Sequence, residues 1–441
     1  MATLPGLSDS LQPLDVTSDP DVPQRLAIPL GSEWRVEVPQ DSKLQVKILS
    51  GIAEIFGTEL AIDIEYTFQN TNFSIYAVEA TELEWKCLDL ANQSISSNTN
   101  LKHIYNLHFS LEKLRVSSFE GPRVLIVGES SSGKTTLAKY LCSYAIKFKP
   151  YEPVMVNLNP QEGIFSPPGC LSATPISDIL DVSSNTWGQS MTSGATQLHS
   201  KQPIVKNFGL ENISDNRELY MRIIQQLSEV LSNRFQSDPM VRRSGCVIDT
   251  PPFSHFSDDF SELHEIIKLF RITAIVVCAH DDNLAVKIND VLMSQTIPIV
   301  RVPTSNGVVQ VSDVFKRSLQ RSAIKDYFYG DLNTVLSPYT IGVDFDMITV
   351  WQPRSALNTD SGSEALYLPV ETNASNLQHA LVAITYAPRR APVEEVIDAP
   401  ILGFALIMEV NDTRKKLRIL LPVPGRLPDK ALILTAYRYL E

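Results

Sequence analysis

The residues best suited to chemistry lie in the segment RVLIVGESSSGKTT, which runs from position 123 to position 136. Gly128 and Gly133 are separated by four residues and followed directly by Lys134 and Thr135, which completes the G-x-x-x-x-G-K-T pattern of a phosphate-binding loop. Glycines let backbone N–H groups turn inward around phosphate oxygens, and the N-terminus of the next helix adds partial positive charge. The lysine reaches the β- and γ-phosphates, and the threonine hydroxyl binds Mg²⁺. The sequence therefore predicts a nucleoside triphosphate site.

The surroundings of this loop support that prediction, because an apolar strand is expected before it and an amphipathic helix after it. Val124–Val127 is wholly apolar, and Leu137, Leu141 and Tyr144 follow at helical spacing. A surface Gly/Ser loop is the alternative interpretation. The sequence contains no Asn-Lys-x-Asp motif for reading guanine, which favours ATP over GTP. The predicted nucleotide-binding residues of the loop are Gly128, Ser131, Ser132, Gly133, Lys134, Thr135 and Thr136.

A carboxylate on a neighbouring strand is expected to share the Mg²⁺ ion with Thr135. The candidate is Asp249, which directly follows the apolar run Cys246–Ile248. We therefore predict a metal site made of Thr135 and Asp249. The alternative is an aspartate that caps the end of the strand.

Another strand end should face the γ-phosphate of the nucleotide. It belongs to Val154–Leu158, which leads into Asn159, Pro160 and Gln161. A carboxylate at this place could accept a proton from an acceptor hydroxyl. Asn157 and Asn159 are found there, and an asparagine side chain cannot accept a proton at neutral pH. The sequence thus has the phosphate cradle without an evident base, and no catalytic residue is assigned. Two turn-forming asparagines before a proline are the alternative to a ligand role.

Four basic residues, Lys316, Arg317, Arg321 and Lys325, fall on one short segment of expected helix that ends near Gly330. A basic lid over the phosphates would need such charges. A solvated helix face is the simpler interpretation, and residue type alone favours it.

The pattern of apolar residues divides the chain into three parts after an acidic tail. Residues 26–116 contain short alternating strands such as Glu33–Val38 and Lys43–Ile48, which predict a small β domain. Residues 117–335 alternate apolar strands with longer helices, which predicts a parallel sheet covered on both faces. Residues 336–441 return to strands. The expected fold is a multidomain α/β protein, in which a central phosphate-loop NTPase-type parallel sheet is flanked by an N-terminal β domain and a smaller β-rich C-terminal domain.

Several strands can be placed within this scheme. In the C-terminal region Thr340–Trp351 is expected to form a strand pair, with further strands at Ile401–Glu409 and Lys416–Pro422. The polar stretch from Ser355 to Asn376 is expected to form a loop. The strands expected in the central domain are Val124–Val127, Val154–Leu158, Cys246–Ile248, Thr273–Cys278 and Ile297–Val302.

The composition limits the class of protein. The 441 residues include 38 Lys+Arg against 50 Asp+Glu, a net charge of −12, and 44% are hydrophobic. This apolar fraction is typical of globular domains, and the acidic balance argues against nonspecific coating of DNA while leaving a local RNA groove open. Residues 1–25 are acidic without an apolar block, so we expect a disordered tail and no secretory signal. We expect no membrane span, and five scattered cysteines indicate reduced thiols in the cytosol or nucleus.

Over most of its length the sequence resembles the ATP-binding subunit of the fungal pre-mRNA cleavage factor, which is part of the polyadenylation machinery and belongs to the polynucleotide 5′-hydroxyl kinase family. The landmarks run from the first domain into the last, so the resemblance covers nearly all residues after the acidic tail. They are Ile55–Leu60 (IFGTEL), Tyr105–His108 (YNLH), Gly128–Thr136, Cys170–Ile176 (CLSATPI), Tyr327–Gly330 (YFYG) and Pro422–Leu427 (PVPGRL).

The resemblance implies that ATP and Mg²⁺ are held between the first two domains and that the N-terminal domain reads the adenine. Glu33 matches the acidic position that contacts the nucleotide in the family. Asn72 matches a second contact position, which is commonly basic in relatives, so the sequence departs from the family there. An exposed residue at a strand end is the alternative for Asn72.

Kinase-active relatives differ from this sequence at positions that matter for phosphoryl transfer. They carry an Asp at the position of Asn159, a Trp near Phe253, and Arg at the positions of Gln320 and Lys325, while Arg321 is a candidate substitute here. Loss of one electrostatic stabiliser costs about 10²- to 10³-fold in rate. The resemblance therefore implies an inactive relative that binds ATP without turning it over. The alternative is an active ATP-dependent polynucleotide 5′-hydroxyl kinase.

The resemblance also implies partners and a cellular location. The expected partners are the scaffold subunit of the cleavage factor, which contacts the RNA polymerase II tail, other subunits of the 3′-end processing machinery, and RNA. A ligand that binds only the folded form stabilises it, so bound ATP should fix the docked arrangement of the domains and the surface presented to the scaffold subunit. The expected location is the nucleus.

Overall fold

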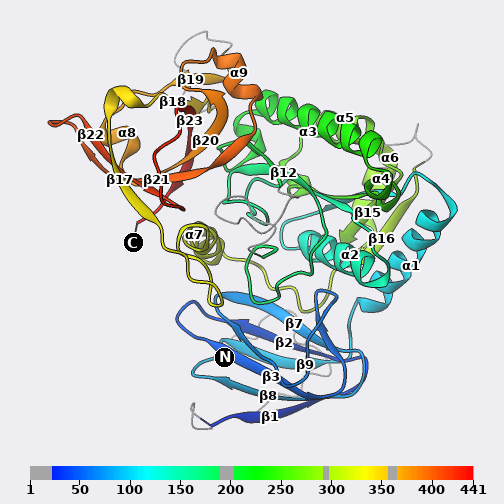
Figure 1. Cartoon of the computed structure of the whole chain (residues 1–441). Helices are drawn as coiled ribbons and strands as arrows, with labels where there is room; N and C mark the ends of the chain where they lie inside the picture. The colour runs from blue at the N-terminus through cyan, green and yellow to red at the C-terminus, as the bar shows by residue number, and fades with distance from the viewer. Residues whose placement is uncertain (1–21, 189–202, 292–296, 356–364, 441) are drawn as a thin grey trace.

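The structure is a computed structural model that describes residues 22–188, 203–291, 297–355 and 365–440. Three domains follow one another along the described chain: an N-terminal β-sandwich, a central α/β domain and a C-terminal domain built around one sheet. Helix α7 (Asp313–Tyr329) lies between the N-terminal and C-terminal domains and beside the central one (Figure 1). Among the described helices, none combines the length and the apolar character needed to cross a membrane.

The N-terminal domain is a sandwich whose two sheets have the strand orders β1-β8-β3-β6 and β5-β4-β7-β2-β9. Because side chains alternate along a strand, β2 directs Trp34 and Val36 into the sandwich core, whereas Glu33 and Arg35 lie on the opposite face. The sheet that contains β2 and β7 is the one turned toward the central domain (Figure 1). The strands are β1 (Gln24–Ile28), β2 (Glu33–Val38), β3 (Leu44–Ser50), β4 (Ala53–Ile55), β5 (Thr58–Glu59), β6 (Glu65–Phe68), β7 (Thr71–Ala77), β8 (Thr81–Cys87) and β9 (Asn92–Ser96).

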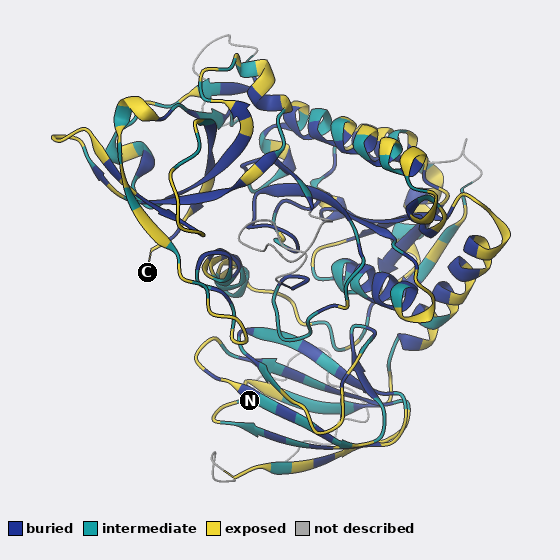
Figure 2. Ribbon diagram, viewed as in Figure 1, coloured by how far each residue is buried: buried dark blue, intermediate teal, exposed yellow. Residues whose placement is uncertain are grey.

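The central domain is built on a seven-stranded sheet in the order β13-β12-β11-β14-β10-β15-β16. Strands β11, β14, β10, β15 and β16 run parallel, and β12 and β13 are each antiparallel to their neighbours. Helices α1 and α2 cover one face of the sheet and α3 and α5 cover the other, so its strands are almost wholly buried except for the edge strand β16 (Figure 2). The strands are β10 (Arg123–Gly128), β11 (Val154–Asn157), β12 (Cys170–Pro175), β13 (Ile204–Asn207), β14 (Cys246–Asp249), β15 (Ala274–Ala279) and β16 (Ile299–Pro303). The helices are α1 (Leu101–Ser117), α2 (Lys134–Phe148), α3 (Arg217–Ser237), α4 (Pro239–Ser244), α5 (Ser261–Phe270) and α6 (Asn283–Val291), with short 3₁₀ turns η1 (Ile213–Asp215) and η2 (Phe253–His255).

The predicted fold class is confirmed, and the five predicted central strands are all present. Strands β12 and β13 were not predicted from the sequence. Because both pair antiparallel with their neighbours, the central sheet is mixed, whereas a parallel sheet was expected. β12 reads CLSATP, and its small and polar residues do not form an apolar run even though all but Pro175 are buried. β13 has only four residues and includes Lys206.

Helix α1 packs on the central domain. Its buried residues Leu107 and Leu111 share a hydrophobic core with Leu137 and Leu141 of α2. The boundary predicted at residue 116 therefore falls at the end of a helix whose apolar face belongs to the central core. The first boundary also shifts: Gln24 and Arg25, placed in the tail by the sequence analysis, begin β1 because they pair with β8. Residues 1–21 of the predicted tail lie outside the described residues.

The C-terminal domain contains a seven-stranded sheet in the order β17-β22-β21-β20-β23-β18-β19. Thr340–Trp351 does contain two strands, but β17 pairs with β22 and β18 pairs with β23 and β19, so the predicted pair is wrong. Part of the stretch predicted to loop out forms β19, and residues 356–364 of it lie outside the described part. The elements are β17 (Tyr339–Asp344), η3 (Phe345–Met347), β18 (Val350–Pro353), β19 (Tyr367–Pro369), α8 (Ala374–Leu377), β20 (Ala380–Pro388), α9 (Val393–Asp398), β21 (Ile401–Asn411), β22 (Lys416–Leu421) and β23 (Lys430–Arg438).

Candidate functional site

The phosphate-binding loop connects the carboxyl end of β10 to the N-terminus of α2, near the middle of the central sheet. Ser131 and Gly133 adopt left-handed backbone angles, with φ values of 53° and 85°. A Cβ atom at Gly128 would lie 2.5 Å from Ser132 Oγ and 2.6 Å from the carbonyl oxygen of Cys278, so only glycine fits there. These constraints curl the loop over the start of α2, where the helix dipole favours an anion.

Lys134 and Thr135 are the first two residues of α2, and the structure directs them toward the loop and toward β14. Lys134 is buried, and its Nζ donates a hydrogen bond to the backbone oxygen of Glu129 at 2.8 Å. Thr135 Oγ1 donates to Asp249 Oδ2 at 2.5 Å. The two residues predicted to hold the metal ion are therefore in direct contact, because β14 lies next to β10 in the sheet.

The surroundings of Asp249 fit a divalent cation. Its side chain is fully buried, and within the described residues its Oδ1 atom has no hydrogen-bond partner. Burial raises the pKa of Asp249 to about 7, and the charge of Glu162 adds to the rise, while Lys134 and Thr135 lower it. Ser132 Oγ is also buried without a partner in the described part of the chain. Carboxylate and hydroxyl oxygens are the ligands that Mg²⁺ takes, so this group of residues could hold it.

The two asparagines at the end of β11 are engaged in a turn. Asn157 Oδ1 accepts a hydrogen bond from Asn159 N at 3.0 Å, and Asn159 Oδ1 accepts one from Gln161 N at 3.2 Å. Asn157 lies directly opposite Asp249 in the parallel register of β11 and β14. The turn-forming alternative is thus confirmed, and both side-chain oxygens are already used beside the metal candidate.

Helix α7 and the segment before it contact both the phosphate loop and this turn. Ser131 Oγ accepts a hydrogen bond from Val311 N at 3.3 Å. Gln161 is held twice from α7: its Oε1 accepts from Lys316 Nζ at 2.6 Å, and its backbone oxygen accepts from Gln320 Nε2 at 3.2 Å. The helix therefore closes over the turn that borders the phosphate site.

Among the four basic residues considered as a lid, Lys316 is the one that contacts this turn. Arg321 donates to the backbone oxygen of Leu440 at 3.1 Å and so reaches the C-terminal end of the chain. Arg317 and Lys325 are exposed. The lid interpretation thus has support for one residue, and the solvated-face interpretation describes Arg317 and Lys325.

Phe253, at the position near which kinase relatives carry a tryptophan, is a core residue. It is 3% exposed and stacks on Phe260 with ring centroids 5.0 Å apart. Lys287 Nζ lies 5.4 Å from the centre of the Phe253 ring. A side chain covered in this way is not a platform on which an RNA base could stack.

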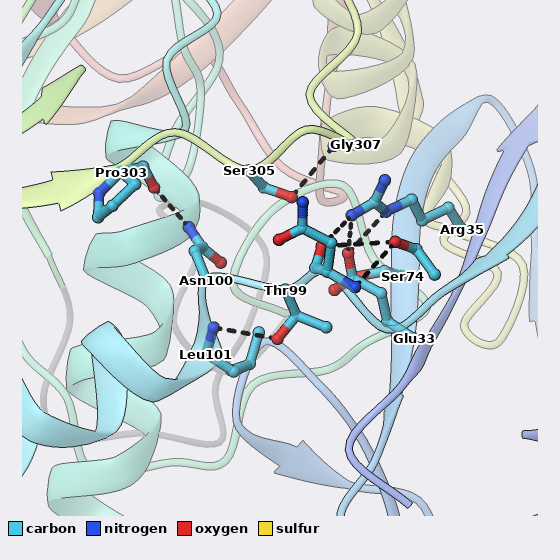
Figure 3. Close-up of polar contacts among 11 residues, drawn as sticks. Glu33, Arg35, Ser74, Thr99, Asn100, Leu101, Pro303, Ser305 and Gly307 are labelled. Atoms are coloured by element: carbon cyan, nitrogen blue, oxygen red, sulfur yellow. Dashed lines mark hydrogen bonds and ion pairs between the residues drawn. The ribbon is translucent and has the colours of Figure 1, made fainter. Parts of the chain in front are cut away.

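The polar face of the N-terminal sandwich meets the segment that follows β16 (Figure 3). Glu33 is buried, and its Oε1 accepts a hydrogen bond from Arg35 Nε at 2.6 Å. Arg35 also donates to the backbone oxygen of Asn98 at 2.8 Å and packs so closely on Gly307 that a Cβ atom there would clash with it. Burial raises the pKa of Glu33, and the charge and hydrogen bond of Arg35 act against that rise. Glu33 therefore lies where the first domain joins the segment that leads to α7.

Asn72 lies elsewhere on the same sheet face. Glu33 stands opposite Tyr76 in the pairing of β2 with β7, whereas Asn72 stands opposite Glu37. The two positions are four residues apart along the paired strands, which corresponds to roughly 13 Å at about 3.3 Å per residue. The structure thus does not bring Asn72 close to Glu33, and its contact with the nucleotide stays a prediction.

Comparison with known proteins assigns the whole chain to a family. Residues 128–330 match the family described as mRNA cleavage and polyadenylation factor CLP1 P-loop, 27–118 the N-terminal beta-sandwich domain of polyadenylation factor, and 336–441 the pre-mRNA cleavage complex II protein Clp1. The chain is 55% identical over 445 residues to the mRNA cleavage and polyadenylation factor CLP1 of Eremothecium gossypii, with 100% of both chains covered. The chain belongs to the CLP1 family of mRNA cleavage and polyadenylation factors.

Other CLP1 proteins agree with this assignment. The Saccharomyces cerevisiae factor is 54% identical over 446 residues, with 100% of both chains covered. A solved structure of the wild-type Clp1p–Pcf11p complex matches with a TM-score of 0.91 at 55% identity, covering 97% of this chain and 100% of that one. A second, also at a TM-score of 0.91, concerns an extended Pcf11p–Clp1p interface and ATP loss in a glycine-to-arginine mutant; it is 54% identical and covers 96% and 100% of the two chains. The family resemblance seen in the sequence is confirmed.

Two residues of this CLP1-family site, Arg35 and Glu162, were not singled out from the sequence. Arg35 could have been found, because it lies two positions after Glu33 on the same face of an alternating strand. Glu162 offered no such signal, since its place depends on the turn after β11. Lys316 was considered as part of a basic lid, but its contact with Gln161 depends on how α7 packs against that turn. The assignment of Gly128 to Thr136, Glu33, Asn72 and Asp249 as ligands stays a prediction.

Proposed function

We propose that this CLP1-family protein is an ATP-binding assembly subunit of the nuclear complex that cleaves and polyadenylates pre-mRNA, and that it holds ATP and Mg²⁺ without turning the nucleotide over. The main support comes from the residue at the end of β11, where a kinase would need a carboxylate facing the γ-phosphate. Asn159 occupies that position, and its side-chain oxygen is bonded within the turn. Identification of the bound nucleotide, together with an assay of γ-phosphate transfer, tests the proposal.

ATP would lie between the first two domains. The central domain offers the phosphate loop, Lys134 and the Thr135–Asp249 pair, and the N-terminal sheet offers Glu33 and Arg35. When bound, the magnesium ion would neutralise phosphate charge. The protein's own part is to bind and orient: backbone N–H groups and Lys134 hold the phosphates, and the polar sheet face reads the base.

The partner is the scaffold subunit of the cleavage factor. Support comes from the CLP1 relatives whose solved structures are complexes with Pcf11p. We propose that the same kind of subunit binds this chain and links it to the RNA polymerase II tail and to the other 3′-end processing subunits. Because ATP would join two domains, its presence would set the relative position of surfaces that such a partner reads.

Replacement of Glu33 tests how the base is read. Glu33→Gln removes the negative charge and keeps the size of a side chain that is 2% exposed. We expect ATP affinity to fall about 10-fold, because a hydrogen bond to a charged group contributes about 1.5 kcal/mol or more. Discrimination between ATP and GTP should weaken as well. Titration of the nucleotide-free protein with each nucleotide by calorimetry measures both effects.

Glu37→Gln is the matched control for this substitution. Glu37 lies four residues further along β2 on the same face, and its Oε2 accepts a hydrogen bond from Asn92 at 3.0 Å. It should leave both nucleotide affinities unchanged. Equal losses for ATP and GTP in Glu33→Gln would show that Glu33 supports the fold of the site without reading the base.

The contacts of α7 predict slow release of the nucleotide. The double variant Lys316→Ala, Gln320→Ala removes both hydrogen bonds from the helix to Gln161. We expect ATP to dissociate about 30-fold faster, since one charged and one neutral hydrogen bond together contribute about 2 kcal/mol in part-exposed surroundings. Chase of a fluorescent ATP analogue in a stopped-flow instrument measures the rate.

Lys325→Ala on the same helix serves as the control, because Lys325 is exposed. It should release ATP at the wild-type rate. An unchanged rate of ATP dissociation in the double variant would mean that α7 does not cover the bound nucleotide, although it contacts Gln161 in the structure.

A further inference from the structure

The turn after β11 holds a second carboxylate near Asp249. Glu162 closes this turn with a hydrogen bond from its backbone N to Asn159 O at 3.3 Å. Asn157 Nδ2 donates to the backbone oxygen of Glu162 at 2.9 Å, and Asn159 Nδ2 donates to Glu162 Oε1 at 3.3 Å. The two asparagines therefore fix both the backbone and the side chain of Glu162.

Glu162 and Asp249 occupy one electrostatic region. Strands β11 and β14 are neighbours, and Asn157, five residues before Glu162, is paired in register with Asp249. Burial raises the pKa of Asp249, and the charge of Glu162 adds to that rise. Burial lowers the pKa of Lys139 of α2, and the charges of both carboxylates act against that fall. The two like charges repel each other, and a cation near both would offset that repulsion.

An independent observation at Asp249 points to a cation site. Asp249 Oδ1 is buried and, within the described residues, lacks a hydrogen-bond partner, although its other oxygen is bonded to Thr135. Glu162 has the complementary property: it is exposed toward solvent, and only its Oε1 is bonded among the described side chains. One carboxylate thus offers a buried free oxygen, and the other offers a free oxygen at the accessible side.

We propose that Glu162, in the turn after β11, positions the Mg²⁺ ion of the ATP site and does not act as a base. Asp249 and Thr135 would bind the ion, and the free carboxylate oxygen of Glu162 would hold its water ligands. Asn159 acts through Glu162 as a positioning residue, because its amide orients the carboxylate. The inference rests on the proposed function, since it requires a nucleotide-bound metal ion.

The experiment uses the whole protein loaded with ATP, stripped of divalent metal with EDTA, and titrated with Mn²⁺ as a paramagnetic probe. Free Mn²⁺ is measured by electron paramagnetic resonance. Glu162→Gln should weaken Mn²⁺ binding about 10-fold, which is the lower end of the effect of outer-shell partners on metal affinity. Its affinity for ATP without metal should equal that of the wild type, which a general structural defect would not allow. Glu162→Asp should restore part of the metal affinity.

Glu265→Gln is the matched control, because Glu265 lies on α5 in a surface ion pair with Lys268. It should bind Mn²⁺ as the wild type does. Wild-type Mn²⁺ affinity in Glu162→Gln, combined with weakened binding in Thr135→Ala, would overturn the role of Glu162 and leave the metal site intact. Wild-type affinity in Thr135→Ala and Asp249→Asn as well would instead contradict the proposed metal site itself.

Discussion

Lys134→Ala is expected to empty the nucleotide site and to destabilise the protein. Lys134 is a buried cation at the start of α2, and it is the residue of the loop suited to the β- and γ-phosphates. Loss of charge-assisted hydrogen bonds to phosphate should weaken ATP binding by about 100-fold or more. A ligand present at 100 times its Kd adds about 2.7 kcal/mol of stability, which the variant forfeits. Mass spectrometry of the co-purified nucleotide and a thermal melt measure the two effects.

The same variant tests whether ATP shapes the partner surface. Binding to the proposed scaffold subunit should weaken once the nucleotide is absent. Lys113→Ala, at an exposed position of α1, should change neither ATP content nor partner binding. Full partner affinity in a verified nucleotide-free Lys134→Ala protein would separate ATP binding from assembly and refute that part of the proposal.

Asp249→Asn is expected to act in opposite directions on metal binding and on the stability of the nucleotide-free protein. In the folded chain the pKa of Asp249 is raised from 3.8 to about 7, chiefly by burial, so its ionised form is unfavourable there. Between about pH 4 and pH 7 the folded state therefore holds a proton on Asp249 that the unfolded state releases, and the contribution of Asp249 to wild-type stability falls as pH rises through this window. The asparagine variant lacks this fall.

We therefore expect nucleotide-free Asp249→Asn to melt a few °C above the wild type at pH 8, with the difference vanishing near pH 4. With ATP and Mg²⁺ present the order should reverse, because the variant loses a charged metal ligand. Melting curves at pH 4, 6 and 8, with and without Mg²⁺–ATP, measure both arms. If nucleotide-free Asp249→Asn melts below the nucleotide-free wild type at pH 8, the buried ionised carboxylate of Asp249 does not destabilise the folded protein.

The parts of the fold and site that the sequence predicted are those whose signal is local. The phosphate loop is specified by adjacent residues, and its glycines are required by close contacts such as that of Gly128 with Cys278. Asp249 could be placed because an apolar strand ends with it, and parallel strands end at the same edge of a sheet.

The parts that the sequence did not predict depend on residues far apart in the chain. Strand β20 reads ALVAITYAP and pairs with β21 and β23, but an apolar run alone does not indicate its neighbours. The contact of Arg35 with Gly307 joins segments of two domains. In the sequence, the turn that holds Glu162 shows only two asparagines and a proline. The metal-positioning role that we propose for Glu162 depends on Asp249, which lies on the adjacent strand.

The central claim is that ATP is bound and kept. The most direct test uses one purified sample: the co-purified nucleotide is identified, and γ-phosphate transfer to a 5′-hydroxyl RNA oligonucleotide is then measured with labelled ATP. We expect intact ATP and no transfer, since Asn159 supplies no base and Phe253 is buried. Transfer that disappears in Lys134→Ala would contradict it and establish an active polynucleotide 5′-hydroxyl kinase.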